Sequence, residues 1–104
     1  MKLWIDDIRE APEGYTWCRS VGDAKYCIKR SIYPTNDGKV FEPIDLIDID
    51  HDAGDYAWDG GDYIKLLDWL EENNYNIPIH IHSMNPVGVQ NMRAIIQRNN
   101  WKEI

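Results

Sequence analysis

The sequence predicts one α/β domain built on a parallel sheet. Helical patterns of about 10 to 15 residues alternate with short apolar strands, which is typical of βαβ units. Three of those strands, at residues 2–6, 44–50 and 78–82, end in carboxylates, imidazoles or a hydroxyl. A chain of 104 residues has room for one modest hydrophobic core. We therefore expect a single domain over residues 1–104.

Composition narrows the class of protein. An apolar content of 43% with 12% aromatic residues is typical of a globular domain. A formal net charge of −7 argues against an extended nucleic-acid-binding face. The longest apolar runs are only a few residues, too short for a membrane span, and no apolar signal region precedes Asp6. Two cysteines, Cys18 and Cys27, then indicate reduced thiols, and we expect a cytoplasmic protein.

The first half of the chain predicts two strands and a helix. The strands are residues 2–6 and residues 15–19, joined by a loop of turn-forming residues that includes Pro12 and Gly14. Ser20, followed by Asp23 three residues later, resembles a capping box and predicts a helix start. Residues 33–42 contain the turn signal Asn-Asp-Gly and predict a loop.

The second half continues the alternation. After the strand at 44–50 and an acidic, glycine-bearing loop at 53–61, a helix is predicted by apolar residues at i, i+3, i+4 and i+7, namely Tyr63, Leu66, Leu67 and Leu70. The strand at 78–82 follows. Asn85 and Pro86 then predict a helix with Asn as N-cap and Pro at its first position. Residues 101–104 predict a last short strand.

Two missing helices affect the expected layers. About seven loop residues separate the first two strands, too few for a crossover helix. No helix follows residues 101–104 either. The sequence therefore predicts either a three-layer fold or a parallel sheet that is partly uncovered.

Functional side chains follow the predicted strands. In open α/β sheets, ligands bind beyond the carboxyl ends of the strands. If the three strands lie side by side and parallel, their ends bring together Asp6, Asp7, Asp50, His51, Asp52, His82 and Ser83. We expect a site at this edge of the sheet.

These blocks resemble a known family. A strand followed by Asp-Asp, a strand ending in Asp and a strand ending in Ser resemble a response-regulator receiver domain, with Asp50 at the phosphoacceptor position. The pattern is more similar to the cyclic-phosphate-processing receiver-like family, through the blocks Trp4-Ile5-Asp6-Asp7-Ile8-Arg9, Asp50-His51-Asp52, Ile81-His82-Ser83-Met84-Asn85-Pro86-Val87-Gly88 and Asn91-Met92. The resemblance implies a receiver-like, Rossmannoid (flavodoxin-like) fold, from which this sequence departs by lacking the first and last receiver helices. It also implies a role in processing cyclic phosphates on nucleotides or RNA ends.

The chain departs from ordinary receivers at one position. Receivers carry a Lys at the end of their fifth strand, and Lys102 is the only candidate for it here.

Clustered carboxylates predict a cation site. Asp6, Asp7 and Asp50 are the candidate ligands, with Asp52 as a possible fourth. Carboxylates gathered at one edge repel one another, and a hard cation with oxygen ligands, Mg²⁺ or Mn²⁺, relieves that repulsion. The competing interpretation is that some of them are helix caps or solvated loop acids.

The remaining candidates concern acid–base chemistry and phosphate binding. The candidate catalytic residues are His51, His82 and Asp50, and we expect the His82 imidazole to lie beside Asp50. An unperturbed imidazole titrates near ~6.5, which suits acid–base work at neutral pH. Ser83 and Asn85, at a helix start, predict a phosphate cradle, and Arg9 predicts an anion clamp. A histidine is more often structural than catalytic, and Arg9 is also compatible with a plain surface role.

Strand alternation predicts a polar sheet face. Asp48, Asp50 and Asp52 share one side of their strand, as do His80 and His82 on theirs, with Trp4 on the matching side of the first strand. We expect this face to be uncovered and to serve as a substrate groove or a homodimer interface. The competing interpretation is that the loop at 33–43 covers it.

The predicted function is a metal-assisted phosphoesterase acting on a cyclic or terminal phosphate of a small molecule or RNA end. The alternative is a non-catalytic degenerate receiver that binds a protein partner or nucleotide in signalling.

Overall fold

The computed structural model describes residues 1–39 and 41–104 and contains one four-stranded parallel sheet. Its strands are β1 (Lys2–Ile5), β2 (Tyr15–Cys18), β3 (Leu46–Ile49) and β4 (Ile79–Ile81), in the order β2-β1-β3-β4. Three helices, α1 (Val21–Ile32), α2 (Ile64–Glu72) and α3 (Pro86–Arg98), follow β2, β3 and β4, and a 3₁₀ turn, η1, covers Gly54–Tyr56. The fold is the receiver-like α/β arrangement that the sequence predicts.

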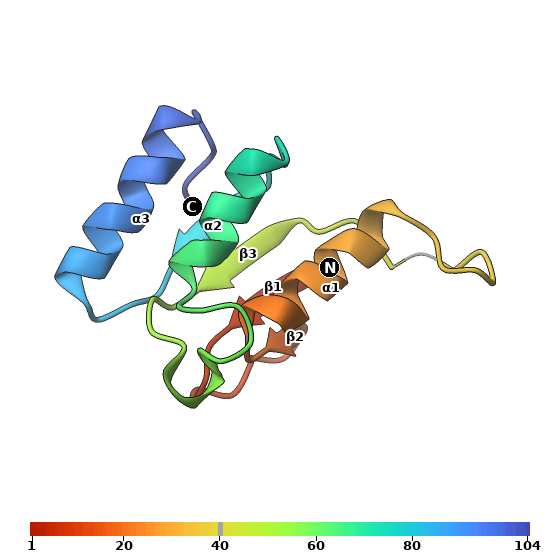
Figure 1. The fold of residues 1–104 in the computed structure, drawn as a ribbon, viewed down its shortest axis with the longest axis horizontal. Helices are drawn as coiled ribbons and strands as arrows, with labels where there is room; N and C mark the ends of the chain where they lie inside the picture. Colours follow the sequence, from red (N-terminus) through yellow and green to blue (C-terminus); the bar gives the residue numbers. More distant parts are fainter. Residues whose placement is uncertain (40) are drawn as a thin grey trace.

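The three helices pack on one face of the sheet (Figure 1). After β2, every crossover moves across the sheet in the same direction, so right-handed connections put their helices on the same side. The alternate strand residues on that side form the core with the apolar stripes of the helices; these strand residues are Leu3, Ile5, Ile47, Ile49 and Ile79. The step from β1 to β2 runs the other way and contains no helix, as predicted, so the second face of the sheet has no helical cover there.

The helix starts are those that the sequence predicts. The Ser20 hydroxyl accepts a hydrogen bond from the Asp23 N–H at 3.0 Å, which caps α1. The Asn85 side chain accepts one from the Gly88 N–H at 3.0 Å, with Pro86 in the first turn of α3. Because only residues 82–85 separate β4 from α3, the first turn of α3 lies near the carboxyl ends of the strands.

The strands are shorter than predicted. Asp6, Asp50 and His82 lie just beyond their strands, although their N–H groups continue the ladder to the carbonyls of neighbouring strands. The predicted last strand at 101–104 is wrong in extent. A single parallel bridge joins Glu103 to Ile79 on the free edge of β4.

The loop at 33–42 includes residue 40, which lies outside the described residues. The described part packs on α1. The Phe41 N–H donates to the Arg30 carbonyl at 2.9 Å, and its ring meets Tyr26 edge to face. Among the described residues, this loop therefore packs on the helical side and not on the polar sheet face.

That second face is polar, as predicted. The register places Trp4, Asp48 and His80 level with one another on adjacent strands, on the side opposite the core. The chain itself covers part of the face. The Trp4 indole N–H donates to the Arg9 carbonyl at 2.9 Å, and a His80 ring nitrogen lies 2.8 Å from the Ile104 carbonyl. Docking of a second copy on this face stays a prediction.

None of the helices in the described ranges has the length and hydropathy that a membrane crossing requires.

Candidate functional site

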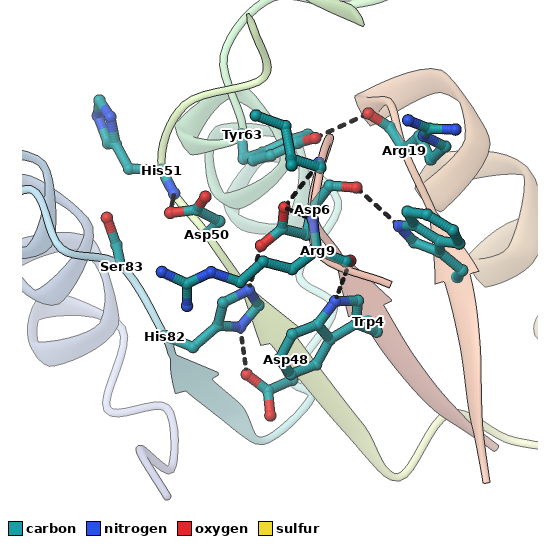
Figure 2. A network of polar contacts seen from close by, with 12 residues as sticks. Trp4, Asp6, Arg9, Arg19, Asp48, Asp50, His51, Tyr63, His82 and Ser83 are labelled. Carbon is teal, nitrogen blue, oxygen red and sulfur yellow. Dashed lines mark hydrogen bonds and ion pairs between the residues drawn. The ribbon is translucent and has the colours of Figure 1, made fainter. Parts of the chain in front are cut away.

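Three carboxylates meet at the carboxyl ends of β1 and β3. Asp6, Asp7 and Asp50 each offer one oxygen, and these oxygens all lie within 4.8 Å of one another. We call these three residues the acid cluster. The backbone aligns them, since the Asp50 N–H donates to the Ile5 carbonyl at 2.9 Å, next to the start of the Asp6-Asp7 turn. Figure 2 shows Asp6 and Asp50 at this edge of the sheet.

Asp6 is the most tightly held member of the acid cluster. One of its oxygens accepts the N–H groups of Ile8 at 2.9 Å and Arg9 at 2.8 Å, and the other lies 3.0 Å from His82 Nε2. Burial alone would raise the pKa of Asp6, but the hydrogen bonds from Arg9, Ile8 and His82 bring it below its ordinary value. Asp6 is therefore ionised, with a fixed orientation.

Asp7 is held differently. Burial raises the pKa of its carboxyl, and the negative charges of Asp6 and Asp50 raise it further. Its carboxylate also lies so close to Gly54 that a Cβ at that position would be 2.3 Å from Asp7 Oδ2. The surroundings of the Asp7 carboxyl therefore disfavour its negative charge, and its position depends on the absence of a side chain at Gly54.

His82 lies between two carboxylates and under an indole. Its Nδ1 is 2.5 Å from Asp48 Oδ1 and its Nε2 is 3.0 Å from Asp6 Oδ2. The ring stacks on Trp4 with centroids 3.9 Å apart, and its side chain is 9% exposed. Both carboxylates can accept from this ring only when both nitrogens carry a proton. The predicted neighbour of His82 was Asp50; the ring in fact contacts Asp6 and Asp48 (Figure 2).

The structure does not bring His51 against the acid cluster. Its ring packs on the first turn of α3, where a Cβ at Gly88 would be 2.4 Å from it. His51 Nδ1 lies 2.9 Å from Asp52 Oδ1 and 3.4 Å from Asn85 Nδ2. In Figure 2 its side chain points away from Asp50. Asp52 lies outside the acid cluster, with 63% of its side chain exposed.

The predicted phosphate-binding residues line one cavity. A cavity of about 270 Å³ is bordered by Arg9, Asp50, Asp52, Ser83, Met84 and Asn85. We call it the Arg9 cavity. The Ser83 hydroxyl accepts the Asn85 N–H at 3.1 Å, which places both residues at the N-terminal end of α3. Because Asp50 belongs to both, the Arg9 cavity adjoins the acid cluster.

Sequence reasoning did not identify Arg19, Gly54 and the aromatic loop after it as parts of this edge. Gly54 comes two positions after Asp52 in the Asp50-His51-Asp52 block, and a glycine so close to the predicted site was a signal for it. Arg19 ends a strand like many surface residues, and nothing in the sequence marks that its guanidinium donates to the Asp7 carbonyl at 2.7 Å.

Comparison with protein families decides the membership of this chain. Residues 1–98 match the model of the cyclic-phosphate processing receiver domain. The chain belongs to that family. Searches among curated proteins and among solved structures gave no significant match. Family membership supports a role in cyclic-phosphate processing, and the receiver-like fold has the acid cluster at the carboxyl ends of its strands, where ligands bind in open α/β sheets.

One receiver feature is missing from this edge in the described residues. The bridge between Glu103 and Ile79 sets Glu103 level with Ile47. Lys102 therefore lies toward the amino ends of the strands, at the opposite end of the sheet from the acid cluster. It does not occupy the position of the Lys that receivers carry.

Proposed function

We propose that this domain hydrolyses a cyclic phosphate ester with the help of a divalent cation. The main support for the proposal is that the acid cluster lies beside the Arg9 cavity. The acid cluster can hold a cation, and the Arg9 cavity can hold an anion. A phosphate bound in the Arg9 cavity would reach the cluster through Asp50. That juxtaposition is what metal-assisted attack on phosphorus requires.

The donor set fits a hard cation. Asp6, Asp7 and Asp50 supply carboxylate oxygens, the ligands that Mg²⁺ and Mn²⁺ prefer. The raised pKa of Asp7, caused by burial and by the charges of Asp6 and Asp50, indicates a cluster that gains from added positive charge. A cation held there would polarise the phosphoryl group or activate water.

The other residues of the edge would hold the phosphate. The Arg9 guanidinium is suited to a bidentate contact with phosphate oxygens, and Ser83 and Asn85 border the same cavity at the start of α3. During hydrolysis a water oxygen forms a bond to phosphorus, one ring P–O bond breaks, and the leaving oxygen takes a proton. The phosphate-binding residues would align that bond with the acid cluster.

The imidazoles would take different parts in the proton transfers. His82 faces Asp6, so it would keep that carboxylate oriented and act as a proton donor behind it. His51 contacts Asp52 and Asn85, which border the Arg9 cavity. It would therefore exchange protons with the phosphate from the side of the Arg9 cavity.

A calorimetric titration tests the cation site. Mg²⁺ or Mn²⁺ should bind the wild type at one site, and Asp50→Asn should weaken binding at least tenfold, about 1.4 kcal/mol. Asp52→Asn is the matched control, because Asp52 lies outside the acid cluster, and it should leave the affinity unchanged. Absence of heat in the wild type would remove the cation from the proposal.

A substrate screen tests the reaction. The wild type should open 2′,3′-cyclic nucleotides, cyclic ADP-ribose phosphates or RNA cyclic ends in the presence of Mg²⁺ or Mn²⁺, and chelation should stop turnover. Binding of these compounds with no turnover under any cation would favour a non-catalytic receiver that binds a nucleotide.

A further inference from the structure

A second cavity opens beside the acid cluster. It measures about 580 Å³ and is lined by Ile8, Arg19, Tyr56 and Trp58, with Asp7 and Asp55 as its carboxylates. We call it the Trp58 cavity. Because Asp7 borders the Trp58 cavity and Asp50 borders the Arg9 cavity, the two cavities meet at the acid cluster. A ligand with a phosphate in one therefore has a place for its remaining part in the other.

The lining of the Trp58 cavity contains two aromatic rings, those of Tyr56 and Trp58. The Arg19 guanidinium carbon lies 4.7 Å from the ring centre of Tyr56, a cation–π contact that helps hold this ring at the cavity, and 4.6 Å from the ring centre of Trp17. The guanidinium also donates to the Asp7 carbonyl at 2.7 Å and 3.2 Å, which ties the lining to the acid cluster. Aromatic side chains such as Tyr56 and Trp58 are the groups on which nucleobases stack.

Trp58 is exposed but sits on an anchored loop. Its relative exposure is 81%, although the residue that follows it is fixed to the start of α1. The Ser20 hydroxyl donates to Asp59 Oδ2 at 2.6 Å, and the Gly22 N–H donates to the Asp59 carbonyl at 3.1 Å. An indole held at the surface beside a cavity, with Ile8 at 79% exposure on the same cavity, is an apolar patch available to a ligand.

We infer that the Trp58 cavity binds the nucleobase of a nucleotide whose phosphate occupies the Arg9 cavity. The placement of the phosphate rests on the proposed function; the base-binding role rests on the lining itself. Asp55 at the cavity accepts hydrogen bonds and can pair with an exocyclic amino group, so the site suits cytosine, adenine or guanine. The net charge of −7 disfavours a long polyanion, so the ligand is a mononucleotide or the end of a chain.

Nucleoside titration tests the base-binding role without any phosphate. Cytidine and adenosine, added to ¹⁵N-labelled protein, should shift the indole N–H signal of Trp58, identified by its loss in Trp58→Phe. Trp58→Ala should weaken nucleoside binding at least tenfold, and Trp58→Phe should retain most of it. Tyr33→Ala, which removes an exposed aromatic ring beyond the C-terminal end of α1, is the matched control and should bind like the wild type.

Kinetics with paired substrates test the link between the two cavities. The wild type should have a KM at least tenfold lower for cytidine 2′,3′-cyclic phosphate than for the base-free ribose 2,3-cyclic phosphate, and Trp58→Ala should abolish that difference. If nucleosides fail to bind, or if the wild type treats both substrates alike, the base-binding role is wrong. Because the nucleoside titration needs no turnover, it separates this outcome from failure of the hydrolytic proposal.

Discussion

His82 connects the acid cluster to the polar face of the sheet. One ring nitrogen faces Asp6 at the strand end, and the other faces Asp48, a carboxylate inside β3 that is only 6% exposed. The Trp4 indole covers one side of the ring. A carboxylate–imidazole–carboxylate arrangement of this kind fixes the orientation of its members, as it does around metal ligands. The imidazole therefore positions Asp6 and stabilises the sheet, in addition to the proton transfer proposed for it.

Replacing His82 should affect rate and stability together. His82→Asn should lower kcat for a cyclic-phosphate substrate by ~10²–10⁴-fold, the range for a group that moves a proton. It should also cost ~1–3 kcal/mol in the free energy of unfolding, because Asp48 would be left buried without its partner. Turnover and denaturant unfolding measure the two effects.

The matched control for His82 is a histidine on the same face of β4. Among the described residues, the His80 ring has one hydrogen-bonding partner, the Ile104 carbonyl at 2.8 Å. His80→Asn should change kcat and stability much less than His82→Asn. Equal losses of activity in the two variants would contradict a special role for His82.

At the scale of elements, the turn that begins at Gly54 positions Asp7. Gly54 has φ +54°, a left-handed backbone conformation, and its missing side chain leaves room for the Asp7 carboxylate. Gly54→Ala should weaken binding of Mg²⁺ or Mn²⁺ about tenfold, because the new methyl group would displace an acid-cluster ligand. Calorimetric titration measures the affinity.

Gly14→Ala separates this displacement from backbone strain. Gly14 also has a positive φ, +87°, but a Cβ there would meet nothing within 4 Å. Both variants should lose ~1–2 kcal/mol of stability from the left-handed backbone. Only Gly54→Ala should lose cation affinity, and a similar loss in Gly14→Ala would show that strain alone is responsible.

Helices α2 and α3 are joined by a charged pair with a clear pH dependence. The Arg98 guanidinium donates to both carboxylate oxygens of Glu71 at 2.6 and 2.7 Å. The hydrogen bond from Arg98, with a second from Asn99, lowers the pKa of Glu71 from 4.5 to about 2. A lowered carboxyl pKa adds stability above the unfolded value of 4.5, and this stability is lost as the pH falls through about 2.

Replacing Glu71 should lower stability only where its carboxyl is ionised. The Tm of Glu71→Gln should lie below that of the wild type at pH 7, and the difference in Tm should shrink below pH 4.5 and vanish near pH 2. The effect should be modest, since both side chains are partly exposed. Glu72→Gln, at the adjacent exposed position, should leave the pH dependence of Tm unchanged. A constant Tm difference across the pH range would contradict the assignment.

At the scale of the whole molecule, the fold predicts a domain that does not accept a phosphoryl group. The resemblance to receivers puts Asp50 at the phosphoacceptor position, but Lys102 lies at the opposite end of the sheet. Without that cation an acyl phosphate on Asp50 would lack a stabilising contact. Incubation with acetyl phosphate and Mg²⁺ should therefore leave the intact mass unchanged. A hydroxylamine-sensitive gain of one phosphoryl group would instead support a signalling role.

The features that the sequence predicted correctly are those that depend on neighbouring residues or on the regular geometry of strands. Ser20 and Asn85 cap helices through their own side chains, so both helix starts could be located from composition. The acid cluster was predictable because carboxyl ends of parallel strands share one edge. The polar sheet face followed from side-chain alternation at Asp48 and His80.

Other features depend on contacts that no local pattern shows. The direction of the His51 ring is decided by the space at Gly88, thirty-odd positions along the chain. The extent of the predicted last strand depended on how many of residues 101–104 pair with β4. The structure has a single bridge there, between Glu103 and Ile79, so no strand forms. The aromatic lining of the Trp58 cavity comes from a loop whose position depends on a hydrogen bond from Ser20 to Asp59.

The strand order also has a consequence for how the chain folds. β1 pairs with β2 through nearby residues such as Lys2 and Tyr15, but with β3 through Lys2 and Leu46, which closes a much longer loop. Asp6 and Asp7 therefore stay apart from Asp50 until that distant pairing forms. The pairing of β1 with β3 also gathers these mutually repelling charges, so their repulsion opposes this pairing. Salt that screens those charges should ease this step, while a cation that needs all three ligands acts only on the finished sheet.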